Sequence, residues 1–158
     1  MLALLAVSCG REGVIVLSVD PGKIVGTAVW SEGKVMCSQS SYKQFLPWAE
    51  STVRTYMPWD LHVVCEDYII GPQTLRKGKD ARWPIGVAFT LEHWCDVHEV
   101  PFTLQSPSKG KAFSTDAKLK ALGWYAPSPG GHKNDALRHL LVYLVDHGLI
   151  DPPVLDPA

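Results

Sequence analysis

Short apolar runs rich in β-branched residues divide the chain into candidate strands. The first run ends at Asp20, and the Pro21-Gly22 that follows is typical of a turn. The second and third runs flank Ser31-Glu32-Gly33, a tight-turn sequence, so the first three runs predict an antiparallel meander. In all, the pattern predicts strands at residues 14–20, 24–30, 34–37, 61–67 and 101–105.

Longer segments with apolar residues at helical spacing separate and follow these strands. They predict helices at residues 43–56, 87–97, 115–122 and 132–147. The order β-β-β-α-β-α-β-α-α is typical of an α/β fold in which a mixed five-stranded sheet carries helices on both faces. Because the chain shows no repeat and no linker, we expect one domain over residues 1–158, with its core at 14–147 and a loose, proline-rich tail.

Composition indicates a globular chain and gives no global sign of a nucleic-acid partner. Apolar residues make up 46% of the 158 positions and charged residues 20%, which excludes an intrinsically disordered chain. The formal net charge is −1, so a nucleic-acid partner would have to be recognised by local basic patches. No Gly-x-x-x-x-Gly-Lys-Ser/Thr sequence is present, which excludes a P-loop nucleotide site.

Two features bear on the cellular location. The apolar segment 1–10 is too short to span a bilayer and carries no basic residue, so we expect no membrane partner, although Ser8-Cys9 is faintly similar to a lipoprotein cleavage site. The four cysteines form no C-x-x-C pair and are predicted to be free thiols. Both features favour the reducing cytoplasm.

Acidic residues stand at three places where apolar residues surround them. Asp20 ends the first predicted strand, Glu66 follows the apolar part of the fourth, and Asp135 lies near the start of the last predicted helix. A carboxylate within an apolar strand is unfavourable unless it is paired or binds a metal. The first and fourth strands are natural neighbours in a sheet of this order, so we expect their carboxylates to converge at one end.

The last predicted helix can aim polar side chains at the same point. His132 and Asp135 are three residues apart and therefore share a face, and His139 lies near that side. The roughly opposite arc carries leucines that can meet the sheet, at positions 137, 140, 141 and 144.

Oxygen and nitrogen donors of this kind suit Mg²⁺, with Mn²⁺ able to substitute, rather than a soft metal. Two such ions about 4 Å apart can hold a phosphodiester for in-line hydrolysis. Simpler alternatives stay open: Asp20 as a turn residue, Asp135 as a partner of the helix dipole, and His132 as an exposed helix start. Asp67 has the opposite strand parity to Glu66, so we expect it to support the site rather than to bind metal.

Three segments resemble the acidic motifs of the RuvC family of Holliday junction resolvases, which have the RNase H-like fold. They are Leu17-Ser18-Val19-Asp20-Pro21-Gly22, Val64-Cys65-Glu66-Asp67 and His132-Lys133-Asn134-Asp135-Ala136-Leu137. They occur in the family's order and span residues 14 to about 147. The short chain is similar to bacteriophage-type members.

Two positions depart from the usual pattern of that family. Many members carry an Asp where His132 stands, although a His is a known variant there. Members also often carry an aromatic residue just after the Glu of the fourth strand, where it is used at the junction, and Tyr68 is the candidate here.

The resemblance implies a metal-dependent endonuclease that cuts Holliday junctions, leaving a 5′ phosphate, with other branched DNA as a further candidate substrate. Asp20 would be shared by two Mg²⁺ ions, and Glu66 and Asp135 would complete one ion each. His132 would add a ligand or position the attacking water. A catalytically silent module that binds branched DNA on the same fold is the alternative, and the presence of all four residues disfavours it.

Junction resolution needs two symmetric cuts, which a homodimer with two-fold symmetry would deliver. The amphipathic helix at residues 84–98 is the candidate dimer surface, through Phe89, Trp94 and Val97.

Basic residues gather in two patches that flank the motifs. A predicted loop at 71–83 holds Arg76, Lys77, Lys79 and Arg82, and the segment 103–138 holds Lys109, Lys111, Lys118 and Arg138. Trp83 and Phe113 stand among them, a combination that fits phosphate contacts and base stacking. Charge runs are also common on ordinary solvated surface.

Overall fold

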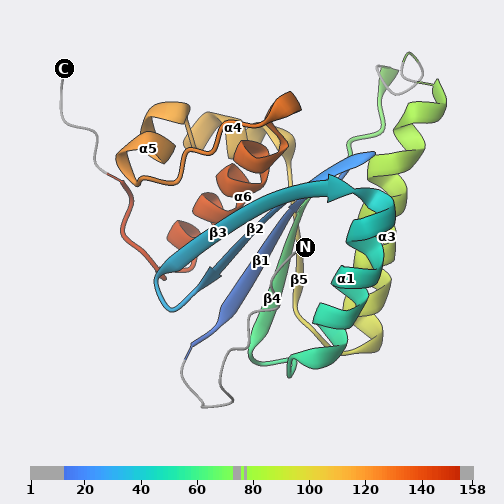
Figure 1. The fold of residues 1–158 in the computed structure, drawn as a ribbon, viewed down its shortest axis with the longest axis horizontal. Helices are drawn as coiled ribbons and strands as arrows, with labels where there is room; N and C mark the ends of the chain where they lie inside the picture. The colour runs from blue at the N-terminus through green and yellow to red at the C-terminus, as the bar shows by residue number, and fades with distance from the viewer. Residues whose placement is uncertain (1–12, 73–75, 77, 154–158) are drawn as a thin grey trace.

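The computed structural model describes residues 13–72, 76 and 78–153. These residues build a five-stranded sheet of order β3-β2-β1-β4-β5, shown edge to edge in Figure 1. The first three strands pair antiparallel, whereas β4 and β5 run parallel to β1, which confirms the predicted mixed sheet. The strands are β1 (Ile15–Asp20), β2 (Ile24–Ser31), β3 (Lys34–Ser41), β4 (Leu61–Glu66) and β5 (Phe102–Gln105).

Helices cover both faces of the sheet, as predicted (Figure 1). One face carries α1 (Tyr42–Thr55) and α3 (Arg82–Val97), and the other carries α6 (His132–Asp146) with two short helices beside it. The short helices are α4 (Pro107–Phe113) and α5 (Asp116–Ala121), and the 3-10 turns are η1 (Gly78–Ala81) and η2 (Pro129–Gly131).

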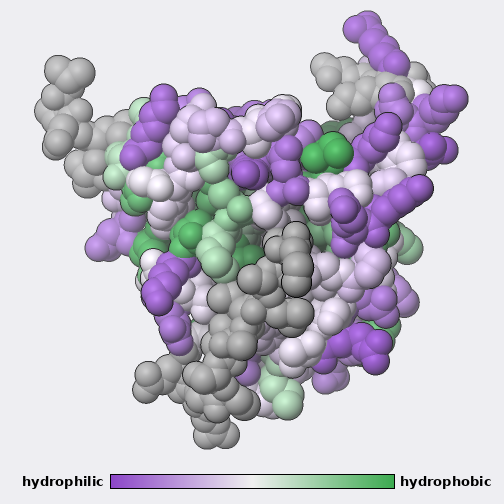
Figure 2. All heavy atoms as spheres, in the orientation of Figure 1, coloured by the Kyte–Doolittle hydropathy of each residue, from purple (hydrophilic) through white to green (hydrophobic). Residues whose placement is uncertain are grey.

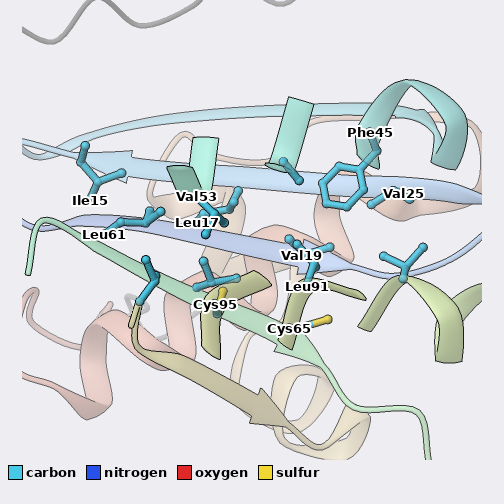
Figure 3. Close-up of a cluster of buried hydrophobic side chains, with 14 residues drawn as sticks. Ile15, Leu17, Val19, Val25, Phe45, Val53, Leu61, Cys65, Leu91 and Cys95 are labelled. Atoms are coloured by element: carbon cyan, nitrogen blue, oxygen red, sulfur yellow. The ribbon is translucent and has the colours of Figure 1, made fainter. Parts of the chain in front are cut away.

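Alternation along β1 divides its side chains between two cores. Ile15, Leu17 and Val19 point to the α1 and α3 face, where they join Phe45 and Leu91 in a buried cluster (Figure 3). The even-numbered side chains point to the α6 face, and Val16 there packs with residues of β4 and α6. Asp20 belongs to this even-numbered set.

The leucines of α6 meet the sheet as the sequence predicts. Leu137, Leu140, Leu141 and Leu144 are fully buried against the same face as Val16 and Val64. This packing leaves the N-terminal turn of α6 at the edge of the sheet where β1 and β4 end.

The structure corrects the predicted elements in three places. β3 continues from Lys34 to Ser41, four residues beyond the predicted end, because its polar second half pairs with β2 through the backbone ladder rather than through apolar side chains. The segment Pro107–Phe113, predicted as loop, forms α4, whose sequence has no apolar periodicity to reveal it. The predicted loop at 71–83 includes η1 and the first residues of α3.

Within the described residues no helix is both long enough and apolar enough to cross a bilayer. Cys37, Cys65 and Cys95 are free thiols, as predicted. Cys9, the apolar segment 1–10 and Pro157 of the predicted loose tail lie outside the described residues.

Candidate active site

The ends of two neighbouring parallel strands bring Asp20 and Glu66 to one edge of the sheet. Val19 of β1 pairs with Cys65 of β4, so the next residue of each strand lies at the same edge and on the α6 face. Asp20 is 8% exposed, and the Glu66 side chain is 20% exposed. The predicted convergence of the strand-end carboxylates is therefore found.

A glycine lets the start of α6 reach this edge. Gly26 of β2 is the register partner of Asp20, and a Cβ built on Gly26 would lie 2.0 Å from the carbonyl oxygen of His132. Any other residue at position 26 would push α6 off the sheet. The approach places His132 Nδ1 2.8 Å from Asp20 Oδ2.

The contact with Asp20 fixes how His132 can act. An ionised carboxylate only accepts hydrogen bonds, so Nδ1–H of His132 donates to it and the lone pair of Nε2 is left for a water or a cation. Gly130 keeps that nitrogen open, because a Cβ at this position would lie 2.9 Å from Nε2. The positive φ of 75° at Gly130 also favours glycine.

Asp135 is held from its own helix. Arg138, three residues later, forms an ion pair with Asp135 and a second one with Asp116 of α5, and its Nε donates to the Ser114 carbonyl at 3.1 Å. The sequence placed Arg138 in a basic patch, but its guanidinium is occupied by these contacts. It therefore fixes the position of Asp135 rather than presenting a free charge.

Glu66 is held by a buried histidine. His139 is 2% exposed, and its Nε2 lies 2.8 Å from Glu66 Oε2. Its Nδ1 lies 3.0 Å from Oε1 of Gln105, the residue that pairs with Glu66 across the parallel strands. The sequence places His139 near this side of α6 without indicating a role for it, and Gln105 carries no signal because a polar residue at the end of a short strand is common.

Electrostatics indicate that the three carboxylates share one site. Burial raises the pKa of Asp20 to about 6, against the lowering effect of its hydrogen bond from His132. The charges of Glu66 and Asp135 raise this pKa further, which places both near Asp20. Like charges around a buried carboxylate are the environment that a divalent cation relieves, and all the donors are hard oxygens, so the residues fit Mg²⁺.

As they are positioned, however, the three carboxylates contact basic side chains of α6 rather than one another. No group of three His, Cys, Asp or Glu side chains in the described chain is arranged to hold a metal ion. Each carboxylate is instead held by one basic side chain of α6, in the pairs Asp20–His132, Asp135–Arg138 and Glu66–His139.

Three further features, the Cys65 thiol, the backbone of Asp67 and a groove on the other face of the sheet, do not supply catalytic groups. Burial raises the pKa of the Cys65 thiol well above its usual value, which keeps it protonated and unsuited as a nucleophile. The backbone N–H of Asp67 donates to the Gln105 carbonyl at 2.8 Å. A groove of about 810 Å³ lies on the α1 face, lined by Ile15, Leu17 and Trp48, and none of the three carboxylates borders it.

The candidate DNA-binding residues divide into exposed and engaged groups. Arg76, Lys79, Arg82 and Lys111 are exposed. Figure 2 shows hydrophilic residues gathered at the upper right, over the chain that joins β4 to α3. Tyr68 is half-buried close after β4, and Lys77 lies outside the described residues.

Two of the predicted DNA-binding lysines already have partners. Lys109 Nζ pairs with Asp146 at 2.5 Å. Lys118 Nζ donates to the Phe113 carbonyl at 2.8 Å and lies 4.1 Å from the centre of the Phe113 ring.

The candidate dimer helix needs one correction. Phe89 is 71% exposed and Val97 58%, but Trp94 is half-buried and packs against the core cluster. At about 100° per residue, Trp94 falls on the side of α3 that carries the buried Val87 and Leu91, so it cannot belong to the exposed stripe.

Comparison with known proteins agrees with this architecture. No family model matches the sequence, and no curated protein matches it either. Among solved structures, RuvC from Thermus thermophilus in complex with Holliday junction substrate superposes with a TM-score of 0.58 at 18% identity, over 90% of this chain and 99% of that one. A second Thermus thermophilus RuvC structure gives 0.53 at 20% identity, over 85% and 97% of the two chains. The chain thus has the RNase H-like fold of the RuvC Holliday junction resolvases.

Proposed function

We propose that this protein is a divalent-metal-dependent endonuclease that cuts four-way DNA junctions by phosphodiester hydrolysis, acting in the cytoplasm. The observation that carries the proposal is the convergence of Asp20, Glu66 and Asp135 at one edge of the sheet, where like charges surround a buried carboxylate. The fold supports it, because a solved structure with this fold is a RuvC in complex with a Holliday junction substrate.

In this proposal the carboxylates hold two Mg²⁺ ions, for which Mn²⁺ can substitute. Asp20 would be the ligand common to both ions, because its side chain is the most buried of the three and the charges of both other acids raise its pKa. A bound ion of this kind lowers the pKa of a water molecule and stabilises the charge that develops on the phosphodiester oxygens. Glu66 and Asp135 would reach the ions through the carboxylate oxygens that His139 and Arg138 do not engage, Oε1 and Oδ2.

His132 contributes the group that faces the reaction. Its Nδ1–H is held by Asp20, so Nε2 presents a lone pair that can bind a cation or accept a proton from water. Hydrolysis with the 3′ oxygen leaving gives a 5′ phosphate and a 3′ hydroxyl. The exposed basic residues Arg76, Lys79 and Arg82 would contact the phosphates of the DNA arms.

The test is incubation with a synthetic four-way junction in Mg²⁺, in Mn²⁺ and in EDTA, with linear duplexes of the same sequences as control. We expect paired cuts near the branch point with either metal, 5′-phosphate ends, and no cutting in EDTA. Flap and fork substrates in the same assay establish whether other branched DNA is cut.

The matched variant is Asp20→Asn, which keeps the shape of the side chain and removes its charge. It should bind the junction like the wild type and cut it at no measurable rate. Binding without cutting by the wild type in both metals would instead support the silent binding module. Cutting by Asp20→Asn at the wild-type rate would refute the proposed metal site.

A further inference from the structure

We propose that His139 is a positioning residue that fixes the orientation of the Glu66 carboxylate for cation binding. The inference rests on the proposed function and deepens it, since it concerns the residue that holds one of the three proposed ligands. It starts from the hydrogen bond between His139 Nε2 and Glu66 Oε2, which is 2.8 Å long.

The hydrogen bond selects which Glu66 oxygen is free. The carboxylate accepts from Nε2–H through Oε2, so Oε1 carries no bond from this histidine. His139 is 2% exposed and Glu66 is 20% exposed, so the bond ties Oε2 to a buried partner, and Oε1 is the oxygen that remains for a cation. A carboxylate tied in this way loses less rotational freedom when it binds a cation.

The other ring nitrogen is held as well. Gln105 ends β5 directly beside Glu66 in the parallel pair, and its Oε1 lies 3.0 Å from His139 Nδ1. A side-chain amide can present its oxygen or, after a half-turn, its nitrogen, so it satisfies Nδ1 whether or not that atom carries a proton. The ring is therefore held at both of its nitrogens.

Helix α4 closes the ring from its open face. A Cβ built on Gly110 would lie 2.9 Å from Cε1 and 3.0 Å from Nε2 of His139, so only a glycine allows α4 to pack here. Gly110 is itself buried in the middle of this short helix. Glycine is less favourable than alanine in the interior of a helix, and this contact explains why a glycine stands here.

Four elements thus cooperate to hold one carboxylate. β4 supplies Glu66, α6 supplies the ring, β5 supplies the amide and α4 supplies the wall. A buried histidine with a purely structural role would need hydrogen-bond partners but not a partner that faces the candidate catalytic edge. Because its partner Glu66 lies at that edge, His139 fits a positioning role rather than a purely structural one.

The experiment measures Mn²⁺ binding by calorimetry without DNA, together with junction affinity and single-turnover cleavage. His139→Phe keeps a ring of similar size and removes the donor, whereas His139→Gln retains a donor near the position of Nε2. We expect His139→Phe to weaken Mn²⁺ binding about 10- to 100-fold and to slow cleavage by a similar factor, with junction affinity changed less than about twofold. His139→Gln should recover most of the Mn²⁺ affinity.

Gly110→Ala provides a second variant that changes neither the histidine nor the glutamate. Its Cβ must displace the ring, so Mn²⁺ affinity should fall although both hydrogen-bonding side chains are intact. Gly86→Ala, on an exposed turn of α3 with nothing within 4 Å of the added Cβ, is the matched control and should bind Mn²⁺ like the wild type. Gly110→Ala also keeps the test decisive if His139→Phe does not fold.

The outcomes separate this inference from the proposed function. A folded His139→Phe, or a Gly110→Ala variant, that binds Mn²⁺ like the wild type overturns the positioning role while leaving junction cleavage intact. Weakened Mn²⁺ binding in these variants, with a wild type that cuts no junction, supports the positioning role and overturns the proposed function.

Discussion

The Nδ1 atom of His132 lies 2.8 Å from Oδ2 of Asp20, although 112 residues separate them in the chain. The contact joins the first turn of α6 to the last residue of β1, and Gly26 on the neighbouring strand makes room for it. The same packing that buries the leucines of α6 therefore carries its histidine to the strand-end carboxylate.

Burial makes the charge of Asp20 unfavourable for folding in the absence of metal, although the hydrogen bond from His132 favours that charge. Burial raises the pKa of Asp20 to about 6, so the folded protein binds this proton more tightly than the unfolded chain does. The contribution of the group to stability therefore falls as the pH rises from about 4 to about 6, and stays low above that range.

We expect Asp20→Asn to raise the free energy of unfolding at pH 8 in EDTA, by up to about 3 kcal/mol, since one pKa unit corresponds to about 1.4 kcal/mol. The gain should shrink toward zero near pH 4, where the wild-type carboxyl is protonated. Urea denaturation at the two pH values measures it. Asp151→Asn, at an exposed position after α6, is the control and should show no such gain. Equal stability of Asp20→Asn and wild type at pH 8 would contradict the assigned burial effect.

His132 can be tested by replacing the ring in two ways. His132→Ala removes Nε2 and should slow cleavage by roughly 10²-fold or more, the range typical of a lost acid–base or ligand group. His132→Asp restores the acid common in the RuvC family and should retain substantial activity in Mg²⁺. Single-turnover rates from about pH 5.5 to 8.5 compare them, because a protonated imidazole can neither bind a cation nor accept a proton.

The pH profiles test the role of the imidazole. His132→Asp should lose less activity than the wild type as the pH falls, because it has no imidazole to protonate. A His132→Ala variant that matches the wild type throughout would make His132 an ordinary helix-start residue and reduce the site to the three carboxylates.

Much of this site could be predicted because strand geometry is local and periodic. When a carboxylate ends an apolar strand, side-chain alternation gives the face of the sheet on which it lies, and the strand end gives the edge. With β1 and β4 as parallel neighbours, Asp20 and Glu66 are therefore expected at the same edge and on the same face, as found. The leucine spacing of α6 likewise predicts which side meets the sheet, so the polar side with His132 and Asp135 follows by geometry.

The residues that hold the carboxylates could not be predicted in the same way. His139 stands among buried leucines, and the sequence of α6 alone does not indicate that its ring nitrogens contact Glu66 and Gln105, the last residues of β4 and β5. Gly110 lies in a short polar segment without apolar periodicity, where glycine is a weak helix former, so the sequence predicts no helix there; the packing of α4 on the His139 ring explains the glycine. Arg138 looked like free basic charge until its two carboxylate partners were in place.

The basic segment after β4 is expected to contact DNA phosphates. Replacing Arg76, Lys77 and Lys79 by glutamine should weaken junction binding and flatten its salt dependence, because each lost phosphate contact lowers the slope by about 0.9. Junction affinity measured over a series of salt concentrations gives the slope. Lys34→Gln, on the hairpin at the opposite end of the sheet, is the control. An unchanged slope in the triple variant would assign these residues to ordinary surface.

The exposed stripe of α3 is expected to form the interface of a homodimer. Phe89 is 71% exposed, and Ile85 and Val97 flank it on the same side of the helix, while Trp94 faces the core. Apolar side chains gathered on one helix face outside the core are typical of an interaction surface. Two sites related by a two-fold axis would then face two strands of a junction.

Phe89→Glu should therefore convert a dimer into a monomer in sedimentation analysis, because it would place two charges in the two-fold interface. It should also uncouple the paired cuts: a supercoiled plasmid that extrudes a cruciform would be nicked by the variant and linearised by the wild type. Met57→Glu replaces an apolar residue that is 55% exposed outside α3 and controls for the added charge, so it should still dimerise and linearise the plasmid. A Phe89→Glu protein that remains dimeric would show that this stripe is not the interface, and a monomeric wild type that linearises the plasmid would show that paired cutting does not depend on a stable dimer.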